Sequence, residues 1–195
     1  MNIFSPGFIR NAEKIIAVIA VAAIVAAKIL HLPAANIFMV VSLCALALVY
    51  ARGLPDVLGE NKEQQNFGLN TATGVLLSVA CVGILFRLQY WPAGKNMVGL
   101  AAIGLPVLIG AVFYFKGKEA RDLSSYFNRL LLRQAVFGAL AIALYVASNK
   151  DLLTLQYPND PEIVRIKSNH FDHPENEAYT KEYMEYVEAQ RYKQQ

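Results

Sequence analysis

The chain has 195 residues, of which 55% are apolar and only 17% charged, and its mean hydropathy is +0.34. A soluble domain usually has about a quarter of its residues charged, and here the apolar residues form long runs within residues 1–148. These features exclude a disordered chain and an ordinary soluble globule. Residues 1–149 hold twelve Lys and Arg against six Asp and Glu. We interpret that basic excess as a membrane-topology signal and expect no binding of nucleic acid.

Five segments reach or approach the length of about 20 mostly apolar residues that a transmembrane helix needs. They cover residues 9–31, 36–54, 69–90, 96–116 and 124–148. The connections after the first and third segments are short and contain proline, which predicts two tandem helical hairpins. The expected fold is therefore an all-α, polytopic integral membrane protein of about five transmembrane helices, with residues 1–148 as its membrane domain.

Lysine and arginine side chains are unevenly distributed between the two ends of these segments. Three bases, Lys28, Arg87 and Lys95, lie at one end. Nine lie at the other: Arg10, Lys14, Arg52, Lys62, Lys116, Lys118, Arg121, Arg129 and Arg133. The positive-inside rule then predicts a cytoplasmic N-terminus and a tail on the opposite side of the membrane, which is the periplasm for a bacterial inner membrane.

The tail, residues 149–195, is more polar and more acidic than the rest. Pro158 and Pro161 indicate an extended connector over residues 149–171. Asp172 is a candidate N-cap for an amphipathic helix over residues 174–193. On that helix Tyr179, Tyr183 and Tyr186 share one face, which we expect to meet a partner, the membrane surface or the chain's own loops.

An internal repeat relates the ends of the first and third apolar segments. Residues 28–35, KILHLPAA, align with residues 87–94, RLQYWPAG. Each copy has a base near the end of a helix, an aromatic ring, a proline that stops the helix and two small residues. We expect Lys28, Arg87 and Trp91 to be interface anchors, while binding of a lipid phosphate or a partner's carboxylate by the two bases remains an alternative.

Residues 85–94, LFRLQYWPAG, resemble the end of the first membrane helix in the GldL/PorL family, inner-membrane motor subunits of gliding motility and type IX secretion in Bacteroidota. The resemblance implies a hairpin whose N-terminus is cytoplasmic and an inner-membrane location. Members of that family, like ExbB-type motors, carry an acidic residue inside the membrane in the second helix, because proton flow needs a titratable carboxylate there. Residues 36–54 and 96–116 contain no Asp or Glu. We therefore expect the hairpin shape without the proton chemistry.

The fifth segment carries alanine at every fourth position, and such a stripe favours close packing against another helix in lipid. The stripe consists of Ala135, Ala139, Ala143 and Ala147. In the fourth segment, Pro106 is expected to kink the helix, with a hinge as the alternative.

Other candidates for chemistry are weak. The run from His170 to His173 groups two imidazoles and a carboxylate, but it is more typical of a solvated helix start than of a metal site. Cys44 and Cys81 read as small buried apolar residues. We expect no catalytic residue, metal or cofactor.

These observations lead to the hypothesis of a non-catalytic inner-membrane subunit or accessory protein of a bacterial envelope complex. Its expected partners are other membrane protein subunits, including a proton-driven motor of the gliding, type IX secretion or TonB-energising kind, and anionic lipid headgroups. The hypothesis assumes a tail helix with no packing surface in its own chain. Two alternatives stay open: a small-solute channel or carrier that uses Thr71, Thr73 and Gln89, and a lipid-acting enzyme that uses His31 and Tyr90.

Overall fold

The computed structural model describes residues 6–58, 66–118 and 124–193. Every element in these ranges is a helix, which confirms the all-α expectation for this part of the chain. The chain divides into two compact units, Met1–Val146 and Ala147–Gln195. We describe each unit separately.

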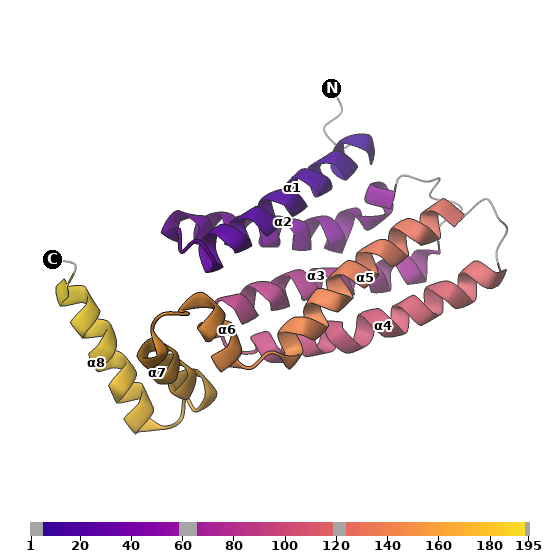
Figure 1. Cartoon of the computed structure of the whole chain (residues 1–195). Helices are drawn as coiled ribbons and strands as arrows, with labels where there is room; N and C mark the ends of the chain where they lie inside the picture. The colour runs from indigo at the N-terminus through magenta and orange to yellow at the C-terminus, as the bar shows by residue number, and fades with distance from the viewer. Residues whose placement is uncertain (1–5, 59–65, 119–123, 194–195) are drawn as a thin grey trace. The chain divides into compact units, whose positions relative to one another are not determined.

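The first unit contains five long helices, which lie alongside one another as rods (Figure 1). Their bounds are Pro6–Lys28 for α1, Pro33–Leu58 for α2, Phe67–Leu88 for α3, Gly94–Lys118 for α4 and Ser124–Val146 for α5. Four of them, α2 to α5, are long and apolar enough to cross a membrane. The helix α1 is long enough as well, but it carries four charged side chains, Arg10, Glu13, Lys14 and Lys28.

Consecutive helices of this unit pack on each other, and α3 also contacts α5. As a result α3 is the most enclosed helix, with 56% of its span buried against 28% for α4 and α5. Small residues permit the close approaches. Gly83 of α3, for example, faces the backbone of α4 so closely that a Cβ atom there would lie 3.0 Å from the amide nitrogen of Val98.

The two copies of the sequence repeat form the turns after α1 and α3, and each has a left-handed residue at the matching position. His31 has φ 55° and Tyr90, at the matching position, has φ 58°. This left-handed residue just past a helix is the usual feature of a Schellman-type end, and in the second turn the amide of Trp91 donates to the carbonyl of Phe86 at 2.9 Å. The ammonium group of Lys28 lies 5.7 Å from the ring centroid of Tyr90, so the two turns meet at the same end of the unit.

The second unit consists of α6 (Asn149–Gln156), α7 (Pro161–Asp172) and α8 (Glu177–Lys193). The expected extended connector over residues 149–171 is therefore wrong, because α6 and α7 occupy it. The reason is capping: Ser148 and Asp151 form a capping box at the start of α6. Asp160 caps α7, with Pro161 in its first turn. That proline starts a helix, which is where proline is favoured, and does not extend the chain.

The last helix begins later than expected. Asp172 is the final residue of α7 and not an N-cap of α8. The side chain of Asn176 takes that role by accepting from the backbone amide of Ala178 at 3.0 Å. α8 then packs on α7 within the second unit.

We predict that Gly94→Ala destabilises the first unit. A Cβ atom at residue 94 would lie 2.7 Å from the amide nitrogen of Arg87 and 2.8 Å from the carbonyl carbon of Phe86, and backbone atoms cannot move aside as a flexible side chain can. The expected loss is about 1–3 kcal/mol, measured by thermal unfolding in detergent. Gly110→Ala is the matched control, since a Cβ atom there meets nothing within 4 Å. Equal melting temperatures for the two variants would contradict the prediction.

A second prediction concerns α6 and pH. Hydrogen bonds from the Ser148 hydroxyl and backbone amide lower the pKa of the Asp151 carboxyl. Because the folded-state pKa is the lower one, the carboxylate stabilises α6 above the pKa of about 3.9 that an unfolded chain has. This stabilisation is lost as pH falls through the folded-state pKa. Amide hydrogen exchange in residues 149–156 should therefore lose protection in acid, and Asp151→Asn should make that protection insensitive to pH over the same range.

Candidate functional site

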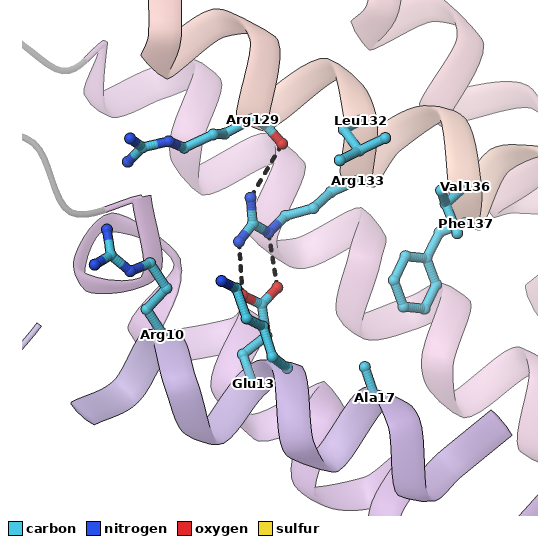
Figure 2. Close-up of a pocket in the computed structure, with 9 residues that line it drawn as sticks. Arg10, Glu13, Ala17, Arg129, Leu132, Arg133, Val136 and Phe137 are labelled. Atoms are coloured by element: carbon cyan, nitrogen blue, oxygen red, sulfur yellow. Dashed lines mark hydrogen bonds and ion pairs between the residues drawn. The ribbon is translucent and has the colours of Figure 1, made fainter. Parts of the chain in front are cut away.

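The most strongly organised polar contact in the first unit joins three helices. Arg133 of α5 donates to both carboxylate oxygens of Glu13 of α1, from Nε at 2.7 Å and from Nη2 at 2.6 Å. The hydroxyl of Tyr50, on α2, donates to the same carboxylate at 2.9 Å. Figure 2 shows the guanidinium group of Arg133 aligned with the carboxylate of Glu13. Both oxygens of this acid are thus engaged.

Burial gives these contacts their energetic weight. Glu13 is only 5% exposed and Tyr50 3%. The remaining arm of Arg133 donates to the backbone carbonyl of Arg129 at 3.1 Å, and Phe137 packs edge-on against the Tyr50 ring at 5.5 Å. A buried ion pair of this kind need not stabilise more than apolar packing would, but removing one partner leaves an uncompensated charge and is costly.

Two further polar pairs link α3 to α5. Tyr126 donates to the side-chain oxygen of Asn70 at 2.5 Å, and the amide group of Gln134 donates to the hydroxyl of Thr73 at 2.8 Å. All four side chains are buried. Together with the ion pair they form a set of buried polar contacts in the first halves of α1, α3 and α5. The side-chain oxygen of Gln134 is buried there without a hydrogen-bond partner in the structure.

A cavity of about 430 Å³ opens between α1 and α5 beside the ion pair. Its lining contains four bases, Arg10, Lys14, Arg129 and Arg133, against the single acid Glu13. The remaining lining is apolar and consists of Ala17, Leu132, Val136 and Phe137. In Figure 2 the guanidinium groups of Arg10 and Arg129 extend toward one side, while Val136 and Phe137 lie on the other.

The expected interface anchors lie at the opposite end of the first unit. Trp91 is exposed and packs against the ring of Phe86 at 5.1 Å, and Lys28 is half-buried beside Tyr90. Arg87 differs, because it is 5% exposed and its Nε donates to the carbonyl of Leu144 at 3.2 Å. Anchoring at headgroups stays a prediction for Lys28 and Trp91, whereas Arg87 contacts α5 inside the protein.

Three of the four alanines of the stripe lie on the outside of α5, whereas Ala147 lies just past the end of that helix and is half-buried. Ala135, Ala139 and Ala143 are exposed. The small-residue contact within this helix is made instead by Gly138, whose added Cβ would lie 3.5 Å from Leu105 of α4. The structure thus places the stripe where another helix or lipid would meet it, and the predicted helix contact stays a prediction.

The tyrosine face of α8 has a packing surface in its own chain, which corrects the assumption made from the sequence. The ring of Tyr183 stacks on His170 of α7 at 4.5 Å and 9°. Tyr179 lies near His173, with ring centroids 6.1 Å apart, and Arg165 pairs with Glu182 at 2.7 Å. The sequence-based expectation of a connector over residues 149–171 omits α7, which is the helix that covers this face.

His170 and Asp172, which the sequence groups as weak candidates for a metal site, contact other polar side chains in the second unit. The Nδ1 atom of His170 lies 3.3 Å from the hydroxyl of Thr180. The carboxylate of Asp172 accepts from the side chain of Asn149 at 2.8 Å.

Cys44 and Cys81 are free thiols, of which Cys44 is exposed and Cys81 buried. Among the described residues no group of three or more His, Cys, Asp and Glu is arranged to hold a metal ion.

The sequence analysis does not predict a role for Glu13, because it considers an intramembrane acid only for residues 36–54 and 96–116. A signal was present: Glu13 is seven residues before Ala20, which is seven before Ala27, and this spacing places all three on one helix face. Since Ala20 and Ala27 are buried, the same face carries Glu13 into the protein. The identity of its partner, 120 residues away, had no local signal.

Comparison of the chain with protein families, with curated proteins and with solved structures found no match.

We predict that Arg133→Leu destabilises the first unit by about 3–5 kcal/mol, because the carboxylate of Glu13 stays buried without its cation. The double variant Glu13→Leu/Arg133→Leu should recover most of this loss, since no charge remains buried. Tyr50→Phe removes one hydrogen bond and should cost about 1 kcal/mol. Denaturant titration in detergent measures all three. If Arg133→Leu is as stable as the unaltered protein, the ion pair does not hold α1 to α5.

Proposed function

We propose that this protein is a non-catalytic membrane subunit that crosses the bilayer five times and binds another membrane protein through the outer face of α5. The observation that carries the proposal is that the buried polar side chains bind one another across helices. The carboxylate of Glu13 is engaged by Arg133 and Tyr50, and Thr73 by Gln134. Groups that a proton path or a solute path would use thus serve to hold the helices together.

The exterior of α1 supports its place as the fifth span. It exposes β-branched apolar side chains along its length, with Ile15 at 60%, Val18 at 69% and Val21 at 62% exposed. In water this surface would be an apolar patch of the kind that soluble proteins avoid, whereas lipid would cover it without cost. The one acid of α1 is neutralised by Arg133, which removes the main obstacle to insertion.

The face of α5 that carries Ala135, Ala139 and Ala143 is the proposed contact with the partner. A helix surface that meets only lipid gains nothing from small side chains, but small side chains let two backbones approach closely. The resemblance of residues 85–94 to GldL/PorL suggests the class of partner, an inner-membrane complex that contains a proton-driven motor. Under this proposal the N-terminus is cytoplasmic and the second unit is periplasmic.

We predict that Ala139→Leu/Ala143→Leu abolishes co-purification of the partner from native membranes in mild detergent, because the added side chains separate the two backbones. The control is Ala22→Leu, which makes the same change at an exposed alanine of α1. Mass spectrometry of the purified material measures the partner. The proposal fails if the unaltered protein purifies without a stoichiometric membrane partner, or if both variants retain it equally.

A further inference from the structure

The cavity between α1 and α5 has an excess of positive charge at one end. Arg133 neutralises Glu13 by a bidentate ion pair, so Arg10 and Lys14 contribute charge that no acid of the lining balances. Guanidinium and ammonium groups are the usual protein ligands of phosphate, and arginine binds it with a fork of parallel hydrogen bonds. This end of the cavity is therefore suited to a phosphate group.

The other end of the cavity is suited to a hydrocarbon chain. The contact between residues 13 and 133 shows that α1 and α5 meet within the first half of each helix. Along α1 the lining changes from Arg10 and Lys14 to Ala17, and along α5 it changes from Arg129 to Val136. Seven residues of helix rise about 10 Å, or about two turns. Moving away from the start of each helix, the lining thus changes from basic to apolar, in the same order as the headgroup and the acyl chain of a phospholipid.

From this gradient we infer that the cavity binds one anionic phospholipid, with its phosphate at Arg10 and Lys14 and one acyl chain along Ala17 and Val136. Free phosphate shares the headgroup chemistry but would leave the apolar end empty. The volume of about 430 Å³ lies within the range of small-molecule sites and accommodates a headgroup with the start of a chain. The site is independent of the proposed helix partner and requires only that α1 and α5 lie in a bilayer.

The inference is tested with the full-length protein in mild detergent, by native mass spectrometry during titration with phosphatidylglycerol or phosphatidylcholine. Phosphatidylglycerol should occupy one saturable site at least about tenfold more tightly than phosphatidylcholine. Arg10→Gln/Lys14→Gln should weaken phosphatidylglycerol binding about 25-fold, or about fivefold for each base, and should weaken phosphatidylcholine binding by a smaller factor, because the choline cation of that lipid offsets its phosphate. The matched control is Arg52→Gln/Lys95→Gln, which removes two exposed bases outside the cavity lining.

Three results would overturn the inference. Equal binding of the two lipids would show that the phosphate end does not select charge. An equal loss in the control variant would show a nonspecific effect of surface charge. Displacement of phosphatidylglycerol by an equal concentration of glycerol 3-phosphate would assign the site to free phosphate compounds. If the double variant aggregates, Lys14→Gln alone, at an exposed side chain, should still show the fivefold loss.

Discussion

The ion pair between Glu13 and Arg133 joins the first and last helices of the first unit, 120 residues apart in the chain. In lipid, apolar side chains gain little by leaving the solvent for one another, so helices associate through close packing and polar contacts. Here α1 packs mainly on α2, and the ion pair fixes it to α5 as well. The pair also sets the register of these two helices, because a bidentate contact tolerates little sliding.

The same contact explains how α1 combines a carboxylate with an apolar exterior. A lone buried carboxylate would oppose insertion, but Glu13 receives three hydrogen bonds from Arg133 and Tyr50. Glu13 thus serves as a structural contact among α1, α2 and α5. The resemblance of residues 85–94 to GldL/PorL stays a prediction.

Glu13 and Arg133, which form the ion pair, also line the candidate binding cavity between α1 and α5. Because Arg133 neutralises Glu13, the charges of Arg10 and Lys14 are not balanced by that acid. These two bases line one end of a cavity whose other end is apolar. Four of the nine bases that a count of charges assigns to topology thus line this cavity. In the second unit the stacking of Tyr183 on His170 uses a face for which the sequence predicts an external partner. That leaves α5 as the surface on which the proposed association depends.

The sequence by itself determined the long apolar helices and the turns between the paired segments, because length, hydropathy and a proline with small residues act locally. The matching left-handed residues His31 and Tyr90 follow from that repeat. Capping signals at Ser148 and Asp160 were equally local and could have revealed α6 and α7. Only the tertiary structure decided that Glu13 meets Arg133, that Arg87 contacts Leu144 and that four bases contribute to the lining of one cavity. These pairings depend on which helix faces lie together, and no local pattern in a single sequence records that choice.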